Sequence, residues 1–498
     1  MTASFRFVHA ADLHLDTPFE GVAGPAPDVA RALQEASLQA WDNVVEVALE
    51  RDASLLLIAG DVYDGAQRGL RAQLRFLGGL RRLSEAGVRT FIVHGNHDPL
   101  DGWSAIGEWP PGVHVFGSSG VGTARVDLEG GGVVCVHGIS YATRETTENL
   151  ARRFSRSGDA GVDEGDGHGP ESAGAATLFS EPTGGSAGPA AAASTGAGGT
   201  LVARPAGERS APTPDTRSAP TPTDRSAFHI GLLHANVGGS PEHGNYAPCS
   251  ITDLQAAGMD YWALGHIHKR QVLREGAPWI AYSGDTQGRS PKPSETGAKG
   301  VFVGEVVRNS VSSLEFQPVD VVRFATCAVD VAEAADVPAL QARVLAAIDR
   351  LRDEHTGRAL LVRVELDGRG AVAADLRREG AIGDLLTELR DTCAGRSPFV
   401  WIESVKDRAR SALDLEALRR RGDFSAELLE LADELTAAAG GRVAFVDEAA
   451  AALTGSGKVA QALRETGAGD PPTEAATADV FDAALWTALD ALEREAEE

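Results

Sequence analysis

The chain has 498 residues, of which 43% are hydrophobic and 23% are charged. This length suits about three average domains, and the composition excludes a wholly disordered or collagen-like protein. The formal net charge of −25 disfavours long-range attraction of nucleic acid, so any contact with DNA needs a local source of positive charge.

The N-terminal sequence MTASFRFVH lacks the apolar core of a signal peptide. No run reaches about 18 consecutive apolar residues, which argues against a membrane-spanning helix. The four cysteines are far apart and form no CxxC pair, so we expect reduced thiols rather than disulfides or a structural zinc site. Together these features predict a cytoplasmic protein with no membrane partner.

Strand-like and helical segments alternate over the first 150 residues. Apolar runs at residues 5–10, 55–59 and 90–93 predict buried strands, and apolar residues at helical spacing predict helices at 29–51 and 70–86. This alternation indicates βαβ units and a parallel sheet. Shorter runs predict a second, more antiparallel sheet; they lie at residues 113–116, 124–128 and 133–137.

The middle of the chain changes in composition. Residues 155–226 consist mostly of Gly, Ala, Ser, Thr and Pro, so we expect a disordered insertion in a surface loop. Strand-like sequence then resumes from residue 228 to residue 306. We therefore predict one domain made of residues 1–154 and 227–319.

The remainder, residues 320–498, is predicted to form a smaller, acidic α+β domain. Strands are expected at residues 325–331, 359–366 and 399–405, and helices at about 416–439 and 473–497. Each of the two helical stretches carries an apolar stripe. Such a stripe either packs inside its own domain or docks on a partner's coiled coil.

Polar side chains follow five of the predicted strands at the point where each strand ends. In layered α/β folds, strand ends converge on functional sites. We therefore expect these side chains to lie together; they are Asp12 and His14, Asp61 and Asp64, Asn96, His97 and Asp98, His234, and His266 and His268.

These residue types predict a metal centre. Carboxylate, amide and imidazole groups without a thiolate suit Mn²⁺, and also Fe²⁺ or Zn²⁺. Their number suggests two ions: one held by Asp12, His14, Asp61 and His268, the other by Asp61, Asn96, His234 and His266. Asp61 would bridge the ions. Two such ions can clamp a phosphoryl group during hydrolysis.

The residues left over suggest a proton donor. His97 follows the predicted ligand Asn96 and is not needed as a ligand, so we expect it to protonate the leaving group, oriented by Asp98. Asp64 has a plainer alternative reading as a turn or helix-cap residue.

In their order and spacing, these motifs resemble the signature of the calcineurin-like metallophosphoesterases. The flanking sequences HAADLHLD (9–16), HANVGG (234–239), DYWALGHIHK (260–269) and QGR (287–289) resemble the YhaO branch of the SbcD-type DNA repair exonucleases. This resemblance implies a four-layer αββα sandwich, with Asp64 and Arg289 in supporting or substrate-binding positions. It also implies Mn²⁺-dependent cleavage of DNA ends and single strands, an SbcC-like coiled-coil ATPase partner, a homodimer, and association with the nucleoid.

Two other functions remain open at this point. One is a general metallophosphoesterase acting on small phosphodiesters or phosphomonoesters, because a fold alone does not fix a substrate. The other is a non-catalytic subunit that tethers DNA or the ATPase. A tether could lose metal ligands, whereas all seven predicted ligands and His97 are present here.

Overall fold

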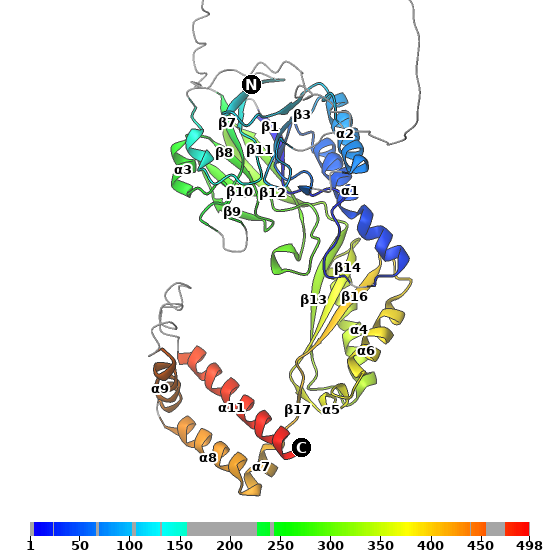
Figure 1. Ribbon diagram of the computed structural model, residues 1–498, viewed down its shortest axis with the longest axis vertical. Coiled ribbons are helices and arrows are strands. Elements are labelled where there is room, and N and C mark those ends of the chain that lie inside the picture. Colours follow the sequence, from blue (N-terminus) through cyan, green and yellow to red (C-terminus); the bar gives the residue numbers. More distant parts are fainter. Residues whose placement is uncertain are drawn as a thin grey trace, which may run out of the picture. The chain divides into compact units, whose positions relative to one another are not determined.

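A computed structural model of the chain divides into two compact units (Figure 1). One contains Met1–Phe19 and Arg31–Val321, and the other contains Glu20–Ala30 and Val322–Glu498. The structure describes residues 4–22, 24–65, 69–101, 106–129, 132–156, 227–239, 244–438, 440–454 and 474–497. The predicted insertion at 155–226 lies outside these ranges except for its first two residues.

The first unit contains two six-stranded sheets. The first sheet has the order β12-β11-β1-β2-β3-β4, in which β1 to β4 run parallel and β11 and β12 are antiparallel additions. The strands are β1 (Ser4–Ala10), β2 (Leu55–Ala59), β3 (Arg89–Val93), β4 (Val113–Val115), β11 (Gly300–Val307) and β12 (Ser310–Pro318). Strand β2 is wholly buried, as its sequence LLLIA predicts for a strand covered on both faces.

The second sheet has the order β5-β6-β7-β8-β10-β9. Its strands are β5 (Gly122–Leu128), β6 (Gly132–Gly138), β7 (Phe228–His234), β8 (Tyr261–Gly265), β9 (Gln271–Arg274) and β10 (Trp279–Tyr282). The prediction that the second sheet is more antiparallel than the first was wrong. The strands β6, β7, β8 and β10 are parallel, only the edge strands β5 and β9 are antiparallel, and β4 joins the first sheet.

Helices cover the outer faces of the two sheets and complete four layers (Figure 1). The helices α1 (Pro27–Glu50) and α2 (Leu70–Glu85) pack on the first sheet through one core cluster. The short helix α3 (Ile251–Ala256) and the 3₁₀ turn at Leu150–Arg153 pack on the second. A third cluster fills the space between the sheets, where Phe7 and Leu57 of one meet Phe228 and Tyr261 of the other. The predicted sandwich is therefore confirmed.

The second unit begins with a three-stranded parallel sheet of β13 (Val322–Asp330), β14 (Ala359–Asp367) and β16 (Val400–Asp407). The helices α4 (Val337–Glu354) and α6 (Ala381–Cys393) connect these strands and share their core. Small elements lie beside them: β15 (Arg369–Gly370), α5 (Ala373–Leu376) and β17 (Arg410–Ser411).

Helices form the rest of the second unit: α7 (Leu415–Arg421), α8 (Phe424–Ala437), α9 (Gly441–Thr454) and α11 (Glu474–Glu497). The single helix predicted at 416–439 is broken in two, because Gly422 adopts a left-handed conformation and Asp423 caps the next helix. Leu418, Leu429 and Leu489 form the buried core of this part. No helix in the described part of the chain is long and apolar enough to cross a membrane.

Candidate metal centre

The strand ends of both sheets meet at one place. Parallel strands β1, β2 and β3 end beside Asp12, Asp61 and Asn96, and β7 and β8 end at His234 and beside His266. Three glycines allow the approach. A Cβ atom on Gly265 would lie 1.9 Å from the Ala59 carbonyl oxygen, and one on Gly60 or Gly95 would lie 2.4 or 2.8 Å from a ring nitrogen of His234.

One group of ligand atoms comes from Asp12, His14 and His268, and all of these atoms lie within 4.8 Å of one another. The Nε2 atoms of the two histidines face each other at 3.2 Å. His14 is buried, and its Nδ1 has no hydrogen-bond partner among the described residues. Two imidazole nitrogens that converge on a carboxylate in a buried pocket are arranged as ligands to a cation.

A second group comes from Asp12, Asp61 and His234, again within 4.8 Å of one another. His234 donates from Nδ1 to the Ala59 carbonyl oxygen at 2.9 Å, which leaves the lone pair of Nε2 for coordination. That Nε2 lies 3.2 Å from Asp61 Oδ2 and 3.0 Å from the side-chain oxygen of Asn96. The predicted ligands of this group therefore converge.

His266 lies at the edge of this arrangement. Its Nε2 is 2.8 Å from the Gly244 carbonyl oxygen, its ring packs 5.2 Å from that of His234, and its backbone N–H donates to Asp12. Asp12 is the carboxylate shared by both ligand groups. The bridging role predicted for Asp61 stays a prediction.

His97 lies at the rim of the site, with its ring 5.1 Å from that of His14. Its Nδ1 is 2.7 Å from Asp64 Oδ1, and Arg289 lies 3.7 Å from the other oxygen of Asp64. The backbone N–H of His97 donates to Asp61 at 2.9 Å. His97 is thus held at both its ring and its backbone, next to the ligand cluster.

The contacts of Asp98 differ from the prediction. Its carboxylate accepts hydrogen bonds from the backbone N–H groups of Val62 and Gly95 and lies 3.0 Å from Nδ1 of His94. Asp98 is fully buried and therefore fixes the loops that carry the ligands. Asp64 is the residue that orients His97, because its carboxylate reaches the imidazole from a neighbouring strand end whereas Asp98 points back into the turn.

The electrostatics suit a cation. Burial lowers the pKa of His234, but the charge and hydrogen bond of Asp61 and the charge of Asp12 together outweigh this and raise that pKa to about 9. Burial likewise lowers the pKa of His268, but the hydrogen bond to Glu295 and the charges of Asp285, Asp12 and Glu295 together outweigh this and raise that pKa to about 9. Burial and the charge of Arg289 hold the pKa of His14 well below its ordinary value. A metal ion that replaces the extra protons of His234 and His268 would supply the positive charge that the neighbouring carboxylates require.

Sequence reasoning missed the loop that supports His268. Glu295 accepts from His268 Nδ1 at 2.5 Å, and the buried Lys299 contacts Asp285 at 2.6 Å and the His268 carbonyl oxygen at 3.0 Å. These residues lie on irregular backbone 17 to 31 positions after His268. Asp285 follows the end of β10, but no periodicity or strand end marks the positions of Glu295 and Lys299 in the sequence.

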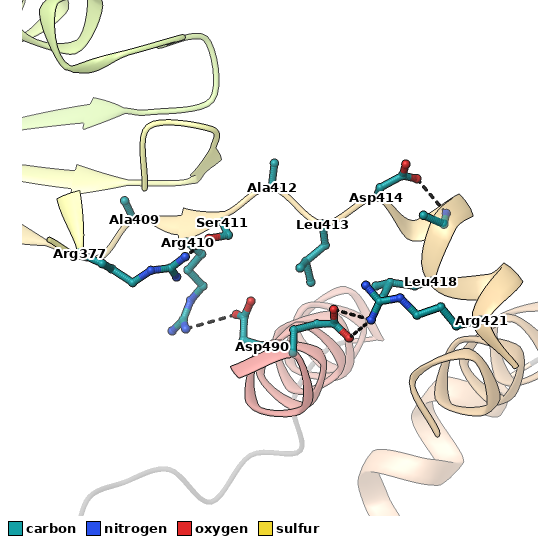
Figure 2. Close-up of a pocket in the computed structure, with 12 residues that line it drawn as sticks. Arg377, Ala409, Arg410, Ser411, Ala412, Leu413, Asp414, Leu418, Arg421 and Asp490 are labelled. Carbon is teal, nitrogen blue, oxygen red and sulfur yellow. Dashed lines mark hydrogen bonds and ion pairs between the residues drawn. The ribbon is translucent and has the colours of Figure 1, made fainter. Parts of the chain in front are cut away.

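The second unit has a cavity of its own, of about 380 Å³, between β17, α7 and α11 (Figure 2). None of the strand-end residues lines it. Two of its arginines form ion pairs, Arg410 with Asp490 at 3.2 Å and Arg421 with Glu493 at 2.8 Å, and Arg377 donates to the Ser411 hydroxyl. These ion pairs join α11 to β17 and α7, so they account for the polar lining without a ligand.

Comparisons with known proteins agree with this geometry. Residues 5–185 match the family described as calcineurin-like phosphoesterase, and residues 324–410 match the middle domain of metallophosphoesterase YhaO. The metallophosphoesterase YhaO of Bacillus subtilis is 32% identical over 420 residues, which are 84% of this chain and 85% of that protein.

Weaker matches are to nucleases and repair proteins. The DNA double-strand break repair protein Mre11 of Haloferax volcanii is 28% identical over 150 residues, 30% of this chain and 31% of that protein. The SbcD component of the nuclease SbcCD of Rhodobacter capsulatus is 32% identical over 130 residues, 25% of this chain and 29% of that protein. With the YhaO match spanning both units, the chain belongs to the calcineurin-like metallophosphoesterases, in their YhaO branch, and is a metal-dependent hydrolase of phosphoester bonds.

Proposed function

We propose that this metallophosphoesterase is a two-metal DNA phosphodiesterase that degrades DNA ends and works with an SbcC-like ATPase. The proposal depends on one observation: the carboxylate of Asp64 holds His97 at 2.7 Å, beside the two groups of candidate metal ligands. A phosphomonoesterase and a phosphodiesterase both need the metal ligands. The poised imidazole supplies the proton that an alkoxide leaving group, such as a nucleotide hydroxyl, requires.

The proposed roles follow from the contacts. Asp12, His14, His268, Asp61, Asn96, His234 and His266 would hold two divalent ions, most simply Mn²⁺. When bound, these ions supply positive charge to the phosphoryl oxygens and lower the pKa of a water. Asp64 keeps Nδ1 of His97 as a donor, so the opposite nitrogen, Nε2, would be the one that protonates the leaving oxygen.

The protonation of His97 supports its role as an acid. Burial lowers the pKa of His97, but the hydrogen bond to Asp64 and the charge of Asp61 more than offset this, so the pKa is raised. The imidazole therefore stays protonated closer to neutral pH and can give up a proton when the ester bond breaks.

Three features support the proposed DNA substrate and ATPase partner: the similarity to nucleases, the charge of the metal ions and one apolar surface. The helix α8 exposes Phe424 (64%) and Leu431 (45%) in a row with the half-buried Leu428 and Leu435, at the spacing of a helix that packs on a coiled coil. The acidic chain would obtain most of its DNA affinity from such a partner and from the metal charge.

A homodimer is the proposed assembly of the first unit. Leu70 and Leu74 lie one turn apart on α2 and are 56% and 58% exposed, an apolar pair suited to a second copy of the same helix. Leu74→Arg is expected to convert a dimer to a monomer in analytical ultracentrifugation. A wild-type chain that is monomeric at all concentrations tested would refute this assembly.

The deciding experiment is Mn²⁺-dependent degradation of end-labelled linear duplex and single-stranded DNA, with bis-p-nitrophenyl phosphate and a cyclic nucleotide as small substrates. His97→Ala should abolish DNA degradation while the protein retains its Mn²⁺. Cleavage of the small esters alone would favour a small-molecule phosphodiesterase. Absence of all cleavage with both ions bound and the ATPase present would favour a tethering subunit.

A further inference from the structure

The loop that carries the predicted site residue Arg289 also reaches one of the metal ligands. Residues 283–299 run from the end of β10 to the start of β11 and contain the 3₁₀ turn Pro293–Glu295. Glu295 is 7% exposed, and Lys299 is 5% exposed. Two buried charged residues on an irregular loop need a specific reason to be there.

The carboxylate of Glu295 has two separate contacts. Oε1 lies 2.5 Å from Nδ1 of His268, and Oε2 accepts from the backbone N–H of Arg289 at 2.8 Å. The first contact fixes the hydrogen of His268 on Nδ1. It therefore leaves the lone pair of Nε2 directed at the ligand group of His14 and Asp12.

The second contact leads to the proposed acid. Arg289 lies 3.7 Å from Asp64, which holds His97 at 2.7 Å. Glu295 thus contacts the metal ligand His268 through one oxygen. Through the other it contacts the backbone of Arg289, whose side chain lies beside Asp64. The Glu295 side chain therefore connects the metal-ligand group to the His97–Asp64 pair.

Lys299 anchors the loop that carries Glu295. Its ammonium group contacts Asp285 Oδ1 at 2.6 Å, donates to the His268 carbonyl oxygen at 3.0 Å, and also donates to the Ser294 carbonyl oxygen. Asp285, Glu295 and His268 also bring ligand atoms within 4.8 Å of one another. Lys299 already supplies a cation beside them, so this cluster supports the metal centre and is not a third metal site.

We infer that Glu295 is a positioning residue: it sets the tautomer and ring orientation of His268 and thereby the affinity of the ion held by Asp12, His14 and His268. The inference rests on the metal centre proposed above and is independent of the substrate. Removal of such a supporting partner typically weakens metal binding by about 10- to 100-fold. The second ion, held by Asp61, Asn96 and His234 with the shared Asp12, should be unaffected, because none of these four residues contacts Glu295 in the described structure.

The test is a calorimetric titration of the full chain with Mn²⁺, together with thermal unfolding in EDTA. Wild type should bind two ions. Glu295→Ala should bind one with wild-type affinity and the other about 10- to 100-fold more weakly, and excess Mn²⁺ should restore hydrolysis of bis-p-nitrophenyl phosphate. Glu295→Gln, which keeps the side-chain shape and one acceptor oxygen, should show a smaller loss. Glu315→Gln is the matched control, since Glu315 is 58% exposed and pairs with Arg51 at the surface.

Three outcomes would overturn the inference. Binding of both ions by Glu295→Ala with affinities within twofold of wild type would show that the contact has no effect on the metal. Equal weakening of both ions, with a lower melting temperature in EDTA, would assign Glu295 a purely structural role. A wild-type chain that binds no Mn²⁺ would remove the metal centre and the role of Glu295 with it, whereas failure of DNA cleavage with intact metal binding would affect only the proposed substrate.

Discussion

Gly95→Ala tests whether the cluster of candidate metal ligands is the active site. Gly95 lies in the loop after β3, outside the left-handed region of backbone conformation, so alanine introduces no backbone strain. Its added Cβ would lie 2.3 Å from Asp61 Oδ1 and 2.8 Å from His234 Nε2. The Asp61 oxygen would have to move by roughly 0.7 Å to reach even the closest tolerated contact of 3.0 Å. Misplacement of about 1 Å in an active site costs on the order of 100-fold in rate.

We therefore expect Gly95→Ala to lose roughly 10- to 100-fold in hydrolysis of bis-p-nitrophenyl phosphate and to bind Mn²⁺ more weakly. Two glycines of α2 are matched controls. A Cβ on Gly78 would meet nothing within 4 Å, so Gly78→Ala should keep full activity; one on Gly79 would lie 2.4 Å from Trp41 Nε1, so Gly79→Ala should lower stability without a specific loss of metal. A Gly95→Ala protein with wild-type activity and Mn²⁺ content would refute the assignment of this site.

Three further predictions concern pH, metal and the second unit. Asp64→Asn removes a carboxylate that raises the pKa of His97, so the alkaline limb of the rate profile should move to lower pH; an unmoved limb would contradict the role of Asp64. Mn²⁺ at 100 times its dissociation constant should stabilise the fold by about 2.7 kcal/mol per site in thermal unfolding, and EDTA should reverse this; identical unfolding with and without Mn²⁺ would argue against binding. Leu429→Ala, at a position 2% exposed, should cost about 2–5 kcal/mol in chemical denaturation, whereas Leu431→Ala, 45% exposed on the same helix, should change stability by less than about 0.5 kcal/mol. Equal effects of the two leucine substitutions would contradict the core assigned to these helices.

The sequence predicted the strands that carry the ligands because each is a short apolar run ended by polar residues. The prediction for β2 has the bounds of the observed strand, and those for β1 and β3 begin only one residue late. Sheet membership was harder. The short strand β4 pairs with β3 through backbone hydrogen bonds, and its three half-buried residues carry no pattern that predicts this pairing.

The sequence predicted which polar side chains would lie together, but not all of the contacts among them. Asp98 follows His97 directly, yet its side chain turns back to Val62 and Gly95, and the orienting carboxylate belongs to Asp64 on another strand end. Adjacency in the chain does not determine which way a side chain in a tight turn points. Glu295 could not be found at all, because only the folded backbone brings it to His268.

The position of β11 has a consequence for synthesis of the protein. This strand, Gly300–Val307, pairs with β1 at the opposite end of the unit's sequence, so β1 keeps an unpaired edge until β11 has been made. A chain still leaving the ribosome therefore presents an open sheet edge, which favours association with other chains. Until its later strands emerge it also lacks His234 and His268, while it already carries Asp12 and Asp61. Products truncated before β7 should accordingly be inert as hydrolases.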